Sequence, residues 1–198
     1  VYKAAADGVS FRDYGLTLTR YFDHINLLKE KYADKITLLR GIELNTQGQY
    51  PNAALPEGVD VSIFDYCLIE NLDDPESITG GDLFSFAARC GCPVKGVAHT
   101  DLFSHIAKRE EDPKAYFKRM ADENIFWEMN VSYDSIHGYR EHQYVLDFIK
   151  DENKQKIIRD AGVYISIGFD SHRYEDYDGY KVHEMYDFLK EKGIKTAD

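Results

Sequence analysis

The chain has 198 residues, of which 43% are hydrophobic and 30% are charged, as is typical of a folded globular protein. This length suits one domain, which we expect to span residues 1–198. The net charge of -11 disfavours electrostatic binding to nucleic acid, and no apolar run approaches the roughly 20 residues of a membrane helix. Three cysteines, and no long apolar segment after Val1, favour a cytoplasmic protein with reduced thiols.

Helix-like and strand-like segments alternate along the chain. An apolar stripe with helical spacing predicts a helix over residues 11–32, and further helices are expected over residues 82–89, 113–123, 140–161 (in one or two pieces) and 181–192. Apolar runs predict strands over residues 36–43, 62–70, 94–99, 125–130 and 163–167. Strands that alternate with helices form parallel βαβ units, so we expect an α/β fold.

Polar side chains of metal-binding type occur where the predicted strands end. These residues are Glu43, Glu70, His99, Glu128 with Asn130, and Asp170 with His172. Ligands of such folds bind where the carboxyl ends of the strands emerge, and these side chains are therefore expected to converge there. Carboxylate and imidazole groups are ligands of divalent cations, so the sequence predicts a metal site.

The last of these strand ends is the stretch from Gly168 to His172. Residues two apart in a strand point the same way, so Asp170 and His172 would lie side by side if the extended conformation continued that far. The alternative is that Asp170 caps the following helix and His172 lies near it by chance.

Four motifs occur in order along the chain: GIEL at residues 41–44, GVAHTD at 96–101, WEMN at 127–130 and GFDSH at 168–172. Together they resemble the polymerase-and-histidinol-phosphatase (PHP) superfamily, and most of all its histidinol-phosphate phosphatase branch. The resemblance implies a distorted, TIM-like (β/α)7 barrel. It also implies two or three divalent metal ions, commonly zinc, manganese or iron, and hydrolysis of phosphate esters.

The resemblance also suggests a role for individual residues. By motif, the positions of family metal ligands are taken by Glu43, His99, Asp170 and His172. Asp170 would also accept a proton from the attacking water. Glu128 and Asn130 match a strand-end pair near the substrate, and Glu128 is a candidate catalytic residue. Arg140 is the candidate catalytic residue that binds phosphate, with Arg173 as an alternative. Asp101 either orients His99 or caps a helix, whereas His105, His137, His142 and His183 are expected at the surface.

Two features depart from the family pattern. The His-x-His strand and the Asp-His or Glu-His strand end that open the family domain are missing, and we expect the segment that carries them to precede Val1. The strand that ends at Glu70 usually ends with histidine in the family. A carboxylate at this position also binds hard cations, which shifts the expected metal toward manganese or magnesium.

The sequence therefore predicts metal-dependent hydrolysis of a small phosphorylated metabolite, with histidinol phosphate as one candidate. Two alternatives stay open. One is a phosphodiesterase or exonuclease of the same superfamily, which the acidic charge and the lack of a basic, aromatic strip disfavour. The other is a non-catalytic metal-binding module, because the amino-terminal histidines are missing from this chain.

Overall fold

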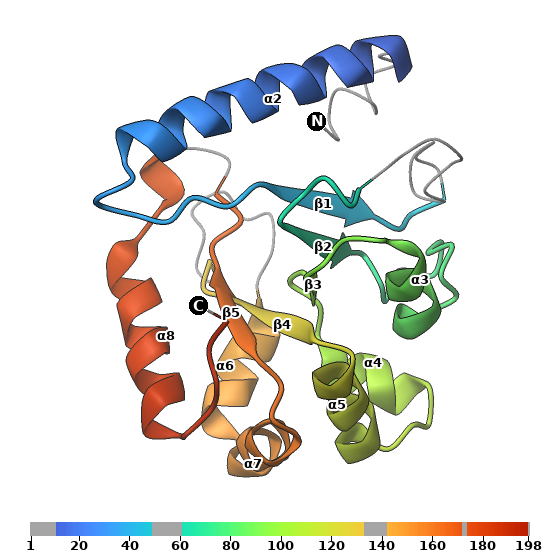
Figure 1. The fold of residues 1–198 in the computed structure, drawn as a ribbon. Helices are drawn as coiled ribbons and strands as arrows, with labels where there is room; N and C mark the ends of the chain where they lie inside the picture. The colour runs from blue at the N-terminus through green and yellow to red at the C-terminus, as the bar shows by residue number, and fades with distance from the viewer. Residues whose placement is uncertain (1–10, 49–60, 133–141, 172–173, 198) are drawn as a thin grey trace. The chain divides into compact units, whose positions relative to one another are not determined.

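The computed structural model describes residues 11–48, 61–132, 142–171 and 174–197. Five strands form one parallel sheet in the order β1-β2-β3-β4-β5, and helices alternate with them along the chain (Figure 1). This confirms the α/β class, whereas closure into a (β/α)7 barrel stays a prediction. The chain divides into two compact units, Val1–Lys95 and Gly96–Asp198, and the short strand β3 (Lys95–Val97) contains the boundary.

The first unit contains helix α2 (Phe11–Lys31), strand β1 (Gly41–Asn45), strand β2 (Tyr66–Glu70) and helix α3 (Leu83–Arg89). Strands β1 and β2 pair in parallel, with Gly41 opposite Tyr66 and Asn45 opposite Glu70. Strand β1 begins at Gly41, later than predicted. The apolar residues Ile36 and Leu39 precede the strand and are 57% and 53% exposed. An apolar run without a neighbouring strand does not form a ladder.

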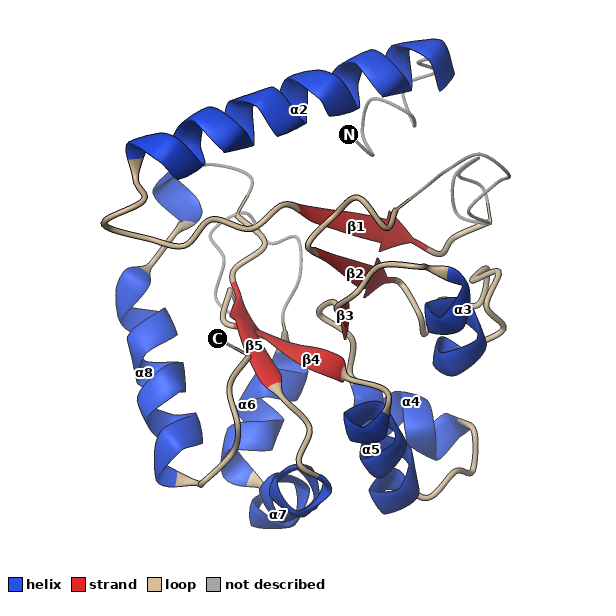
Figure 2. Ribbon diagram, in the orientation of Figure 1, coloured by secondary structure: helices blue, strands red, loops and turns tan. Residues whose placement is uncertain are grey.

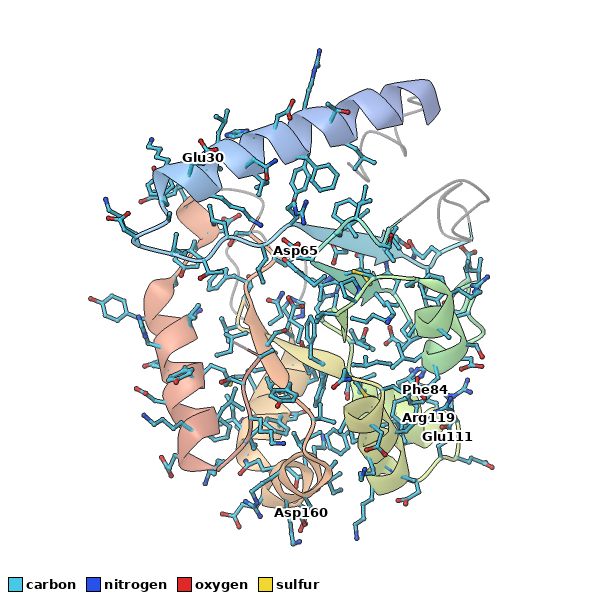
Figure 3. The ribbon with its side chains drawn as sticks, in the orientation of Figure 1. Glu30, Asp65, Phe84, Glu111, Arg119 and Asp160 are labelled. Atoms are coloured by element: carbon cyan, nitrogen blue, oxygen red, sulfur yellow. The ribbon has the colours of Figure 1, made fainter. Side chains whose placement is uncertain are left out.

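Asp65 ties three segments of the first unit together. Its carboxylate accepts hydrogen bonds from the backbone N–H of Arg40 (2.8 Å) and from the Arg40 guanidinium (2.7 and 3.2 Å). Lys29 near the end of helix α2 also donates to it, at 3.2 Å (Figure 3 labels Asp65). The Arg40 side chain, through its hydrogen bonds, lowers the pKa of Asp65 far below the usual value of 3.8, so the carboxylate stays ionised. This network fixes the point at which β1 and β2 begin to pair.

The three cysteines lie in the core of the first unit as free, buried thiols. Cys90 donates a hydrogen bond to the carbonyl of Phe86, and Cys92 donates to the carbonyl of Phe64. Burial raises the pKa of the Cys92 thiol, and hydrogen bonding to Cys90 raises that of Cys67. Buried free thiols of this kind serve as small apolar core residues.

The second unit contains most of the helices. They are α4 (Leu102–Lys108), α5 (Pro113–Asp122), α6 (Gln143–Lys150), α7 (Glu152–Ala161), the 3-10 turn η1 (Tyr174–Asp176) and α8 (Gly179–Glu191). Strand β4 (Ile125–Asn130) pairs in parallel with β5 (Ile165–Gly168). The helix predicted over residues 140–161 is two helices that meet at Asp151, and α7 ends at Gly162, which has a φ of 76°. Helix α4 was not predicted.

Aspartates begin the helices of both units. Each accepts a hydrogen bond from a backbone N–H in the first turn of its helix: Asp82, Asp101, Asp112, Asp151 and Asp178. An ionised side chain at this position satisfies a free N–H group and interacts favourably with the helix dipole. Five of the 35 acidic residues of the chain therefore serve as helix caps in the part that the structure describes.

Strand β4 presents two different faces. Trp127 packs against Phe117 of α5 and against Tyr144 and Phe148 of α6, with ring centroids 5.6, 5.8 and 6.0 Å apart. Helix α5 packs beside β4 in this unit, and α7 packs against both α5 and α6 (Figure 2). Because side chains alternate along a strand, Phe126, Glu128 and Asn130 lie on the opposite face. All six residues of β4 are buried, so a carboxylate and an amide are held in a water-poor environment.

Candidate metal centre

The first unit contributes two carboxylates, Glu43 of β1 and Glu70 at the end of β2. In the parallel register Glu43 lies opposite Leu68, so Glu43 and Glu70 are diagonal neighbours on the same face of the sheet. One carboxylate oxygen of each lies within 4.8 Å of the other. Two carboxylates at this separation repel each other, and a bound cation offsets that repulsion.

Thr46, directly after β1, fixes the backbone at the end of β2. Its N–H and its hydroxyl both donate to the Glu70 carbonyl, at 3.1 and 2.9 Å, and the hydroxyl also contacts the Asn71 carbonyl at 2.9 Å. Asn71 adopts a φ of 59°, so the chain turns sharply as soon as Glu70 has been placed. The carboxylate therefore projects from a rigid strand end.

The second unit contributes His99, two residues beyond β3. Its backbone N–H donates to Oε2 of Glu128 at 2.9 Å, and the next carbonyl, that of Thr100, accepts from the indole N–H of Trp127 at 2.9 Å. Two consecutive residues of β4 therefore hold the turn that carries His99. The imidazole itself is half-buried, and its ring centroid lies 5.8 Å from that of His142.

Glu128 occupies space that the neighbouring strand leaves empty. A Cβ atom at Gly168 of β5 would lie 1.8 Å from Oε1 of Glu128 and 2.4 Å from its carboxyl carbon. The residue was predicted to act in catalysis. What the structure describes is its hydrogen bond to the His99 backbone, which positions a candidate ligand, while a catalytic role stays a prediction.

Tyr144 of α6 completes the hydrogen bonds at the end of β4. Its hydroxyl accepts from the Asn130 N–H at 3.1 Å and donates to the Glu128 carbonyl at 2.9 Å. Burial raises the pKa of Tyr144 far above its usual value, so the group stays a neutral hydroxyl that can do both. The side chain therefore binds one backbone donor and one backbone acceptor at the end of β4.

The expected geometry at Asp170 is wrong. Strand β5 ends at Gly168, and Asp170 is exposed with a φ of 47°, so the extended conformation does not reach it. The rule that residues two apart point the same way therefore does not relate Asp170 to His172. Among the described residues Asp170 is not part of the ligand group that contains Glu43. His172, Arg173, Arg140 and His137 lie outside the described residues, so their predicted roles stay predictions.

Two histidines predicted at the surface are buried, which corrects the sequence analysis. His105 of α4 and His142, the N-cap residue of α6, are each 5% exposed. His183 is exposed as expected. Burial of His142 could not be foreseen, because it depends on the turn that brings the His99 ring beside it. Asp101 is the N-cap of α4, where its carboxylate accepts from the N–H and the hydroxyl of Ser104 at 3.0 and 2.6 Å.

Comparisons with models of protein families, with curated proteins and with solved structures find no match to this chain. In the part of the chain that the structure describes, no helix is both long and apolar enough to cross a membrane.

Proposed function

We propose that Glu43, Glu70 and His99 bind one divalent cation and that the protein is a metal-dependent hydrolase of a small phosphomonoester. One observation carries the metal site: Glu43 and Glu70 lie on the same face of β1 and β2, and one carboxylate oxygen of each lies within 4.8 Å of the other. Two carboxylates and one imidazole are a mixed donor set that suits manganese, iron or zinc, with magnesium also possible. The proposal requires His99 of the second unit to join the carboxylates of the first.

The reaction class follows from the ordered motifs that resemble the PHP superfamily. A bound cation of this kind supplies Lewis-acid polarisation of a phosphoryl oxygen and lowers the pKa of a bound water to about 7. Glu43 and Glu70 provide the negative charge that holds the cation, and His99 provides a neutral nitrogen ligand. Glu128 keeps the His99 turn in place through a charge-assisted hydrogen bond, as supporting residues of metal sites do.

Metal binding is tested first, by titrating Mn²⁺ into the chain and following the ion by electron paramagnetic resonance. We expect saturable binding that weakens at least about 10-fold in Glu43→Gln, Glu70→Gln and His99→Ala, because each variant removes one ligand. Glu76→Gln, an exposed glutamate of the first unit, is the matched control and should bind like the wild type. Equal affinity in all four variants would exclude the site.

The reaction is tested with a chromogenic phosphomonoester and with a single-stranded oligonucleotide, each in the presence of Mn²⁺. We expect turnover of the small ester that His99→Ala lowers at least about 100-fold, as the loss of a metal ligand does. Faster turnover of the oligonucleotide would indicate a phosphodiesterase instead. Saturable metal binding without turnover of either substrate would indicate a non-catalytic module.

A further inference from the structure

Asn130 at the end of β4 has a buried donor that no described group accepts. The residue is 0% exposed, and its side-chain nitrogen, Nδ2, has no hydrogen-bond partner among the residues that the structure describes. Buried polar groups in folded proteins are nearly always paired, so an unpaired one needs an explanation. A bound group that supplies the missing acceptor is one such explanation.

The orientation of this amide is fixed by its neighbours. Its oxygen, Oδ1, accepts the backbone N–H of Ser132 at 3.0 Å, and a backbone N–H can only donate. Oδ1 therefore faces Ser132, and Nδ2 is the atom that lacks a partner. The backbone N–H of Asn130 already donates to the Tyr144 hydroxyl at 3.1 Å, so the backbone of this residue is held as firmly as its side chain.

The unpaired donor lies on the face of β4 that carries Glu128. Side chains two apart in a strand share a face, and Glu128 uses this face to bind the backbone N–H of His99 at 2.9 Å. Gly168 lies opposite Asn130 in the register, and its missing side chain leaves room that the Glu128 carboxylate occupies. Asn130 therefore lies on the same face as Glu128, which positions the proposed ligand His99, and is two residues nearer the carboxyl end of β4.

We propose that Nδ2 of Asn130 donates a hydrogen bond to a non-bridging oxygen of the substrate phosphoryl group. This inference rests on the proposed function, because an amide donor alone fits any acceptor oxygen and the metal site selects the phosphoryl group. A hydrogen bond from a rigid, buried amide to an anionic oxygen is among the stronger kinds, and it needs no rearrangement when the ligand enters. The rival explanation is a structural water, which would make Asn130 important for stability alone.

Two variants test this assignment. Asn130→Asp keeps an oxygen that accepts the Ser132 N–H but replaces the donor with an acceptor. Asn130→Ser is neutral, so it removes the donor from its position without adding charge repulsion. Asn153→Asp introduces the same charge at an exposed position of α7 and is the matched control. If Asn130→Asp does not fold, Asn130→Ser carries the test.

The measurement is the dissociation constant of inorganic phosphate for the Mn²⁺-loaded protein, by calorimetry, together with Mn²⁺ affinity and the urea midpoint. We expect both Asn130 variants to bind phosphate about 10- to 100-fold more weakly, which is the range for a hydrogen bond to a charged group, while Mn²⁺ binding is not weakened. A lower urea midpoint with unchanged phosphate affinity in Asn130→Ser would overturn the assignment in favour of a structural water. Failure of the wild type to bind Mn²⁺ would overturn it together with the proposed function, and the separate metal titration distinguishes the two results.

Discussion

Replacing Gly168 with alanine should force the Glu128 carboxylate away from the His99 backbone. The added Cβ would lie 1.8 Å from Oε1, 2.4 Å from the carboxyl carbon and 2.8 Å from Cγ of Glu128, all well inside van der Waals contact. The backbone at Gly168 has no positive φ, so alanine itself is not strained there. The change in the free energy of unfolding should therefore report the contact between the new methyl group and the Glu128 carboxylate.

The magnitude follows from what the displaced carboxylate loses. Glu128 is 6% exposed and accepts the His99 N–H at 2.9 Å, so moving it breaks a buried hydrogen bond to a charged group. Such a loss costs about 1–3 kcal/mol, and overpacking of a buried site adds about 1–3 kcal/mol. We expect Gly168→Ala to lower the free energy of unfolding by about 2–6 kcal/mol, measured by urea denaturation followed by Trp127 fluorescence.

A double-mutant cycle separates this mechanism from a general loss of stability. In a Glu128→Ala background the carboxylate is absent, so Gly168→Ala should cost less than about 1 kcal/mol. Gly179→Ala is the control, because a Cβ there meets its nearest atom at 3.7 Å and the position begins helix α8, where alanine is favoured. An undiminished effect of Gly168→Ala in the Glu128→Ala background would refute the reasoning.

Three further substitutions test other contacts. Tyr144→Phe should lower the free energy of unfolding by about 1–3 kcal/mol, because it removes the hydroxyl that accepts from the buried Asn130 N–H and donates to the Glu128 carbonyl, and the urea midpoint measures this. Asp65→Asn should lower it by about 1–2 kcal/mol at pH 7. Because the folded-state pKa of Asp65 is depressed, its stabilising effect is fully present above the usual value of 3.8 and declines as the pH falls from there toward the much lower folded-state pKa, so the difference in unfolding free energy between wild type and variant should narrow progressively below about pH 4. Asp101→Ala should cost about 0.5–2 kcal/mol by uncapping α4, with a smaller loss in Asp101→Asn; equal losses in the two variants would argue against capping.

The sequence predicted strand β4 with the correct bounds and helices α2, α3, α5 and α8 to within two residues, because their apolar periodicity is long or their ends are marked by aspartate and glycine. The prediction placed the start of β1 too early, because Ile36 and Leu39 are as apolar as core residues. Only the hydrogen bonds of Asp65 to Arg40 show where β1 begins to pair with β2. Helix α4 was missed because its seven residues carry too little periodicity.

For the candidate site, the strand-end rule selected His99 together with Glu43 and Glu70, and carboxylate oxygens of these two glutamates lie within 4.8 Å of each other. The rule does not extend to Asp170, because it holds only while the backbone stays extended, and Asp170 has a φ of 47°. Neither the burial of His142 nor the contact between Glu128 and Gly168 could be predicted, since both depend on side chains far apart in the sequence.

The turn that carries His99 is hydrogen-bonded to side chains from both faces of β4. The Trp127 indole binds it from the face that packs against the helices, and the Glu128 carboxylate binds it from the other face. The packing of Trp127 against the helices therefore also affects the position of the His99 imidazole. Truncating an aromatic side chain that contacts Trp127, such as Phe117 or Phe148, should be detectable in the nuclear magnetic resonance signals of His99, although neither ring belongs to the candidate centre.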